Sequence, residues 1–99
     1  MRAILQYLCL RPDVAFAGRF NRGMMEVRGG RWVQFNTVPG FPDIHGCMHD
    51  GRALYIEVKM ARGRLTADQK SFLDIASAAG ALAFVARSVD DVIDRMSKQ

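Results

Sequence analysis

Two acidic residues and a lysine in the middle of the sequence have the types and the spacing of a hydrolytic site. Asp43 follows a proline, and Glu57 and Lys59 stand one residue apart at the end of the apolar run at residues 53–56. Because side chains on a strand alternate between its two faces, we expect Glu57 and Lys59 on the same face. A hairpin turn at residues 49–51 would bring Asp43 back beside them. The pattern predicts two carboxylates and an ammonium group gathered at one edge of a sheet.

Electrostatic repulsion between these carboxylates indicates that a cation binds between them. Two unit charges about 4 Å apart interact by roughly 4 kcal/mol at an effective dielectric constant near 20. Lys59 offsets only one of the two negative charges, and the pair would repel a phosphate group. A Mg²⁺ or Mn²⁺ ion takes oxygen ligands, reverses the local charge, polarises a scissile phosphate and lowers the pKa of a bound water. Lys59 would orient that water or stabilise the developing charge. The expected chemistry is phosphodiester hydrolysis.

A different metal site is suggested by His45, Cys47 and His49, which alternate along the same segment. Imidazole and thiolate groups are good zinc ligands, and alternate positions on a strand share one face. Structural zinc sites usually combine paired ligands from two separate elements, and the sequence has no second Cys/His pair. A zinc-stabilised interaction domain is nevertheless kept as an alternative. Otherwise one of the histidines would lie in the outer shell of a magnesium-type site.

Several short motifs follow one another in a distinctive order. They are Pro42-Asp43, Glu57-Val58-Lys59, Gly63-Arg64-Leu65-Thr66 with Gln69, and the segment at residues 80–92. This order resembles the PD-(D/E)xK nuclease superfamily. Within it, the chain is similar to the VRR-NUC (virus-type replication-repair nuclease) domains, particularly the small stand-alone ones of phages and prophages. The likeness extends from about Arg19 to Val92.

The resemblance implies a restriction-endonuclease-like fold and a metal-dependent, structure-selective DNA endonuclease that cuts branched, junction or flap DNA. It implies Asp43 and Glu57 as ligands of Mg²⁺ or Mn²⁺, with the carbonyl oxygen of Val58 as a further ligand. It also implies Lys59 as the catalytic lysine and Gln69 as a helix residue that lines the site.

The chain departs from the family pattern at its start. Family members usually carry a glutamate near the metal on their first helix, whereas no acidic residue precedes Asp13 here. Asp13 comes too late for that role, and Gln6 is a poor metal ligand. The role is therefore assigned to no residue. This departure leaves open a second interpretation, a nucleic-acid-binding module of the same fold with weak or no catalysis.

Basic residues around the expected site are candidates for contacts with the DNA backbone. Such contacts position a nucleic acid without reading its sequence. The candidates are Arg19, Arg62, Arg64, Lys70 and Arg87. A basic excess is also typical of a solvated protein surface, and Arg87 would in that case simply close the preceding strand.

Gln69 has a second, structural interpretation. It stands three residues after Thr66, where its side chain would complete a capping box at the start of a helix. Leu65 just before would serve as the hydrophobic staple. Both roles for Gln69, in the cap and near the metal, are kept as hypotheses.

The remaining pattern predicts the elements that hold these residues. Apolar spacing favours a short helix over residues 2–10 and a hairpin that turns at residues 29–30. The apolar run at 81–86 is typical of an interior strand, and a closing helix begins after Ser88. Together these elements predict an α/β fold, a restriction-endonuclease-like αβββαβ core in which helices flank a mixed central sheet.

Composition limits the classes to which the chain can belong. Its 99 residues make one domain, residues 1–99, and 49% hydrophobic with 24% charged residues is typical of a globular protein. The net charge of +4 favours a polyanionic partner. Two cysteines are too few for a disulfide framework, which indicates a reducing cytosol, and no apolar run reaches the roughly 18 residues that cross a bilayer. With the resemblance, we expect a DNA-binding homodimer in the cytoplasm of a bacterial host, encoded by a phage or prophage.

Overall fold

Helices and strands alternate along the chain in the order that the sequence predicts. The computed structural model describes residues 1–19, 24–27, 31–34 and 38–98. Its elements are α1 (Arg2–Leu10), β1 (Val14–Arg19), β2 (Met24–Val27), β3 (Arg31–Gln34), β4 (Ile44–Met48), β5 (Ala53–Val58), α2 (Ala67–Ala78), β6 (Leu82–Ala86) and α3 (Val89–Ser97). Without the β2–β3 hairpin, this order is the expected αβββαβ core followed by one closing helix.

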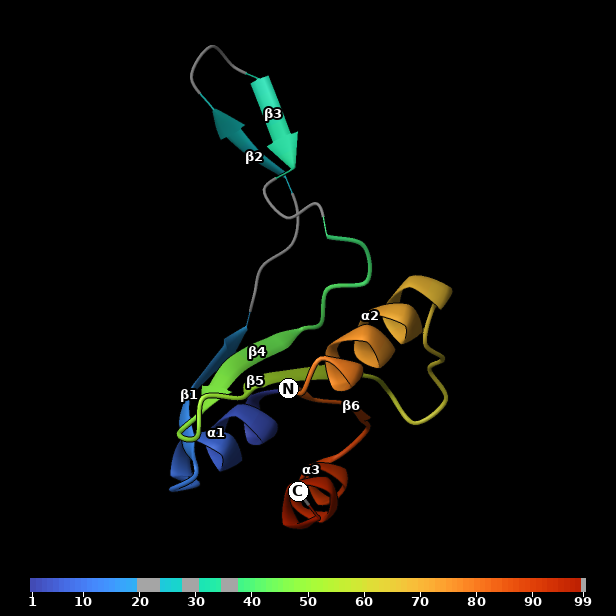
Figure 1. Cartoon of the computed structure of the whole chain (residues 1–99). Coiled ribbons are helices and arrows are strands. Elements are labelled where there is room, and N and C mark those ends of the chain that lie inside the picture. Colours follow the sequence, from blue (N-terminus) through green and yellow to red (C-terminus); the bar gives the residue numbers. More distant parts are fainter. Residues whose placement is uncertain (20–23, 28–30, 35–37, 99) are drawn as a thin grey trace.

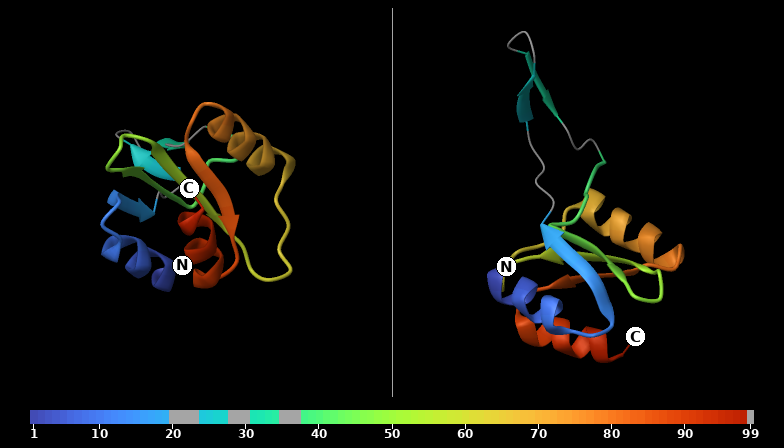
Figure 2. Two further views of the ribbon diagram at one scale, coloured as in Figure 1. Left: turned by 60° about the horizontal axis from the view of Figure 1, so that its bottom comes forward. Right: turned by 90° about the vertical axis from the view of Figure 1, so that its left-hand side faces the viewer.

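A mixed sheet with the strand order β1-β4-β5-β6 forms the centre of the molecule. β1 and β4 pair antiparallel, as do β4 and β5, whereas β6 joins β5 in parallel. Figures 1 and 2 show α1 and α3 together on one face of this sheet and α2 on the other. The α/β class and the mixed sheet are thereby confirmed. In the described part of the chain, every helix is too short or too polar to cross a membrane.

The main core lies between the sheet and the layer of α1 and α3. Leu54 and Ile56 face it from β5, as the two-residue period of a strand requires, and Val92 and Met96 face it from α3. The buried apolar residues of this core are Ile4, Leu8, Val14, Ile44, Met48, Leu54, Ile56, Leu82, Phe84, Ala86, Val92 and Met96. The other face of the sheet lies under α2.

The strands β2 and β3 form a separate hairpin. Met24 pairs with Gln34 and Val27 with Arg31, which confirms the expected antiparallel pairing. The hairpin makes its own two-stranded sheet and projects away from the central one in Figures 1 and 2. The turn expected at residues 29–30 lies outside the described residues.

Side-chain caps fix where the last two helices begin. The hydroxyl of Thr66 accepts a hydrogen bond from the amide of Gln69 at 3.1 Å, and the side chain of Gln69 accepts one from the amide of Thr66 at 2.9 Å. This reciprocal pair is the predicted capping box. Ser88 caps α3 in the same manner, since its hydroxyl accepts from the amide of Asp91 at 3.2 Å.

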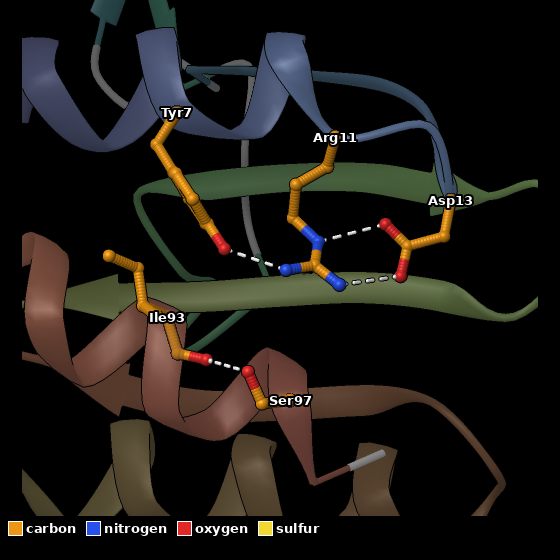
Figure 3. A network of polar contacts seen from close by, with 5 residues as sticks. All are labelled: Tyr7, Arg11, Asp13, Ile93 and Ser97. Carbon is orange, nitrogen blue, oxygen red and sulfur yellow. Dashed lines mark hydrogen bonds and ion pairs between the residues drawn. The ribbon is translucent and has the colours of Figure 1, made fainter.

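The turn from α1 into β1 is held by a polar network (Figure 3). The guanidinium of Arg11 donates to both carboxylate oxygens of Asp13, at 2.8 and 2.9 Å, and to the hydroxyl of Tyr7 at 2.6 Å. The hydrogen bonds to Asp13 raise the pKa of Arg11 above its usual range. The same view shows the hydroxyl of Ser97 donating to the Ile93 carbonyl in the last turn of α3, at 2.7 Å.

Candidate active site

The strands β4 and β5 form the hairpin that the sequence predicts, closed by a turn at residues 48–51. Ile44 pairs with Ile56, and each step back along β4 corresponds to one step forward along β5. Asp43, the residue just before β4, therefore comes opposite Glu57 and projects from the same face of the sheet. This face is the one that α2 covers.

The other end of this hairpin has polar contacts of its own. The amide of Arg52 donates to one carboxylate oxygen of Asp50 at 3.0 Å, and its Nε donates to the other at 2.8 Å. These bonds, the backbone bond foremost, lower the pKa of the Asp50 carboxyl. Asp50 is thus an exposed acid on the same hairpin, a full strand length away from Asp43 and Glu57.

The carboxylate of Asp43 reaches across to β5. Its Oδ2 accepts a hydrogen bond from the amide of Val58 at 3.0 Å. The amide and the carbonyl of one strand residue point to the same side, so the carbonyl of Val58 also faces Asp43. The carboxylate of Asp43 and this carbonyl therefore lie at the same edge of β5, next to Glu57.

Glu57 is almost completely buried, with 2% of its surface exposed, and Gln69 beside it is 8% exposed. Nε2 of Gln69 donates to Oε1 of Glu57 at 3.3 Å. Oε1 of the same Gln69 accepts from the amide of Thr66, so a single side chain caps α2 and contacts the candidate metal ligand. The two hypotheses for Gln69 are compatible, because the cap orients the amide so that its nitrogen faces Glu57.

The loop before β4 fixes the position of Asp43. Gly40 has a φ of 72°, and a Cβ atom there would lie 2.2 Å from the carbonyl oxygen of Asp68, so only glycine lets the loop approach α2 this closely. The ring of Phe41 packs edge-on against Phe72 of α2 at a centroid distance of 5.4 Å. Pro42 is fully buried. This anchoring was not anticipated, although the Gly-Phe-Pro run before Asp43 is its signal in the sequence.

Lys59 follows directly on β5. The amide of Lys59 donates to the carbonyl of Ala86 at 3.0 Å, so the extended backbone of β5 continues through Lys59. Because side chains alternate along a strand, the side chain of Lys59 leaves the backbone on the same side as that of Glu57. The side chain is partly buried. A Cβ atom at Gly63 would lie 3.5 Å from both Cβ and Cδ of Lys59, so the aliphatic stem of the lysine lies against that glycine.

The five candidate DNA contacts have different surroundings. Arg62 and Arg64 are exposed on the loop that follows Lys59. Lys70 is exposed on α2 and forms an ion pair with Asp74 at 2.9 Å. Roles of these residues in DNA binding stay predictions.

Arg87 and Arg19 have contacts or surroundings that the sequence alone does not indicate. Nη1 of Arg87 donates to two backbone carbonyls, those of Met60 at 2.8 Å and Gly63 at 2.5 Å. Arg19 pairs with Ile44 and lies on the α1 side of the sheet, where it lines a groove with residues of α1 that include Gln6. Arg19 is therefore at the correct end of the sheet but on the face opposite Glu57.

The oxygen donors at this edge of the sheet suit a hard divalent cation. Two carboxylates and one backbone carbonyl, from Asp43, Glu57 and Val58, are the kind of ligands that Mg²⁺ and Mn²⁺ take. Among the residues that the structure describes, no three His, Cys, Asp or Glu side chains gather closely enough to hold a metal, so the alternative zinc site of His45, Cys47 and His49 does not form.

A comparison with protein families gives the same assignment. The model of the VRR-NUC domain matches residues 26–90, a segment that includes Asp43, Glu57, Lys59 and Gln69. Searches among curated proteins and among solved structures returned no match. The family match covers well over half of the chain, and the fold and the acid pair agree with it. The chain therefore belongs to the VRR-NUC family of nuclease domains.

Proposed function

We propose that this chain is a divalent-metal-dependent, structure-selective endonuclease that hydrolyses phosphodiester bonds in branched, junction or flap DNA. The observation that carries the proposal is the placement of Asp43 and Glu57 on one face of the β4–β5 hairpin, with Oδ2 of Asp43 hydrogen-bonded to the amide of Val58 at 3.0 Å. Two carboxylates that share one face of a hairpin repel each other, and a cation bound between them would remove that repulsion.

In this proposal Asp43, Glu57 and the carbonyl of Val58 hold Mg²⁺ or Mn²⁺. The ion supplies Lewis-acid stabilisation of the negative charge that develops on the phosphodiester. Glu57 is held in place by Gln69 and shielded from water, so its carboxylate needs no reorganisation when DNA binds.

The basic residues near the acid pair have two different roles in this proposal. Lys59 shares the side of the strand with Glu57, and its ammonium group would donate hydrogen bonds to the attacking water or to a phosphate oxygen. Arg62 and Arg64, exposed on the loop just after it, bind neighbouring phosphates and fix the register of the DNA on the site.

The experiment is a cleavage assay on a panel of labelled junction, flap, nicked and single-stranded DNA, with Mg²⁺, Mn²⁺ or Ca²⁺. We expect cleavage of branched substrates with Mg²⁺ or Mn²⁺. Asp43→Asn keeps an oxygen that can accept from the amide of Val58 but removes the charge, and Lys59→Ala removes the ammonium group. Both substitutions are expected to abolish cleavage. If either variant cuts as fast as the parent chain, the assigned roles are wrong.

Matched controls lie elsewhere on the molecule. Asp50→Asn changes an exposed acid at the opposite end of the same hairpin. Lys98→Ala removes an exposed lysine that pairs with Asp94 on α3. Both controls are expected to cut at the parent rate, since neither residue lies near Glu57.

A DNA-binding module without turnover is the second candidate. The sequence feature that favours it is the lack of an acidic residue in α1, together with the finding that no third acid joins Asp43 and Glu57 among the described residues. Under this alternative the parent chain binds branched DNA with a steep salt dependence but leaves it intact with every divalent ion. The cleavage panel separates the two candidates.

We also propose that the chain works as a homodimer, so that two sites address two strands of a branched substrate. The support is the edge strand β1, whose Phe16 is 63% exposed and offers an apolar contact beside unpaired backbone groups. Light scattering of the parent chain and of Phe16→Asp tests this, with a monomeric mass for the variant as the expected result.

The free thiols of Cys9 and Cys47 fit a reducing bacterial cytoplasm, the compartment we expect for a phage or prophage protein.

A further inference from the structure

Arg87 makes a contact that joins the end of β6 to the loop after β5. Its Nη1 donates to the carbonyl of Met60 at 2.8 Å and to the carbonyl of Gly63 at 2.5 Å. Hydrogen bonds from a charged guanidinium are shorter and stronger than those between neutral groups. One side chain thus holds both ends of the four-residue turn at 60–63.

This turn stands directly against Lys59. The amide of Gly63 donates to the carbonyl of Met60 at 2.9 Å and closes the turn, while the amide of Lys59 is bonded to Ala86 of β6 at 3.0 Å. Gly63 lies close enough to Lys59 that an added Cβ would sit 3.5 Å from the Cβ and Cδ of the lysine. The aliphatic stem of Lys59 therefore lies against the turn, while its backbone is bonded to β6.

The turn itself has little else to hold it. Met60 is 84% exposed, and Ala61 and Arg62 are also exposed, so no apolar burial fixes these residues. Exposed turns with few buried contacts open easily on their own. Besides the closing bond between Gly63 and Met60, the two bonds from Arg87 therefore restrain the turn and, through Gly63, the direction of the Lys59 side chain.

We infer that Arg87 is a positioning residue for Lys59 rather than a contact to the DNA backbone, an inference that rests on the proposed function. Its guanidinium acts through Met60 and Gly63 and touches no reacting atom. Displacing a reacting group by about 1 Å costs on the order of 100-fold in rate, so loss of this restraint lowers turnover without weakening the binding of DNA.

The experiment compares the parent chain, Arg87→Ala and Arg87→Lys on a branched DNA substrate with Mn²⁺. For Arg87→Ala we expect kcat to fall about 10- to 100-fold with KM nearly unchanged. The slope of log affinity against log salt is expected to stay at the parent value, and the amide of Gly63 to exchange its hydrogen faster. Arg52→Ala, which removes an arginine at the far end of the hairpin, is the control.

If the alanine variant does not fold, Arg87→Lys distinguishes a positioning role from a phosphate contact. Lysine keeps the positive charge that a phosphate needs, but its nitrogen is one bond closer to Cα than Nη1 and lacks the planar fork. A positioning role predicts that kcat falls in this variant too, whereas a phosphate contact predicts that the lysine variant keeps both kcat and the salt slope.

Two results would overturn the inference. In one, kcat is unchanged in Arg87→Ala and the salt slope falls by about 0.9, the value for one lost phosphate contact. In the other, neither quantity changes, and Arg87 is simply a surface arginine. A parent chain that cuts no substrate refutes the proposed function and this role with it, while an active parent with unaffected Arg87 variants refutes the role alone.

Discussion

Replacing Gln69 by alanine removes two contacts at once, and a neighbouring substitution separates them. Thr66→Ala removes the hydroxyl that accepts from the amide of Gln69, a cap contact that is typically worth about 1 kcal/mol. Gln69→Ala removes the reciprocal cap bond and also the hydrogen bond from Nε2 to the buried Glu57. Hydrogen bonds to charged groups contribute about 1.5–3 kcal/mol, so the total loss is expected at about 2–4 kcal/mol.

The assay is thermal and urea unfolding, followed by circular dichroism with a chelator present. For a chain of this size each 1 kcal/mol lowers Tm by roughly 4–8 °C, so Gln69→Ala is expected to melt at least about 8 °C below the parent. Ser71→Ala, an exposed change on the same helix, should stay within about 0.5 kcal/mol of the parent.

Equal losses of stability in Gln69→Ala and Thr66→Ala would contradict this prediction, because the contact with Glu57 would then contribute nothing. Gln69→Glu gives an independent check. It keeps an oxygen for the cap but puts a second carboxylate against Glu57, where two charges about 4 Å apart repel by roughly 4 kcal/mol at a dielectric constant near 20. At neutral pH it is expected to be less stable than Gln69→Ala.

Two further predictions concern the loop and the helix beside the site. Gly40→Ala is expected to lower the Tm clearly more than Gly51→Ala. Both glycines have positive φ, but only at Gly40 would a Cβ atom collide with the backbone of α2. Equal losses of Tm in the two variants would contradict this. Lys70→Ala is expected to change the free energy of unfolding by no more than about 0.5 kcal/mol, because the ion pair of Lys70 with Asp74 is exposed. The same variant is expected to lower the slope of log affinity for DNA against log salt by about 0.9. An unchanged slope would exclude a phosphate contact.

Local patterns were sufficient to predict the hairpin that carries the acids. The Gly-containing turn at residues 48–51 and the apolar run of β5 set the register, and the register alone puts Asp43 opposite Glu57. The capping box was equally readable, since it depends only on Thr66 and Gln69 three residues apart.

Contacts between distant segments were not predictable in this way. The register of β1 against β4 shifts between Val14 and Phe16. Such an irregularity changes which residues face the core, and the alternation of polar and apolar residues in the sequence does not reveal it. This is why Arg19 lies on the α1 face. The bonds from Arg87 join residues more than twenty positions apart, and nothing in either segment alone indicates the other.

Titration with Mn²⁺ in the absence of DNA tests whether Asp43 and Glu57 together hold a divalent cation. Electron paramagnetic resonance of free Mn²⁺ measures binding to the parent chain, to Asp43→Asn and to the Asp50→Asn control. We expect Mn²⁺ to bind the parent and the control, and the affinity of Asp43→Asn for Mn²⁺ to be lower by at least about tenfold. Equal affinity of all three proteins for Mn²⁺ would contradict this expectation.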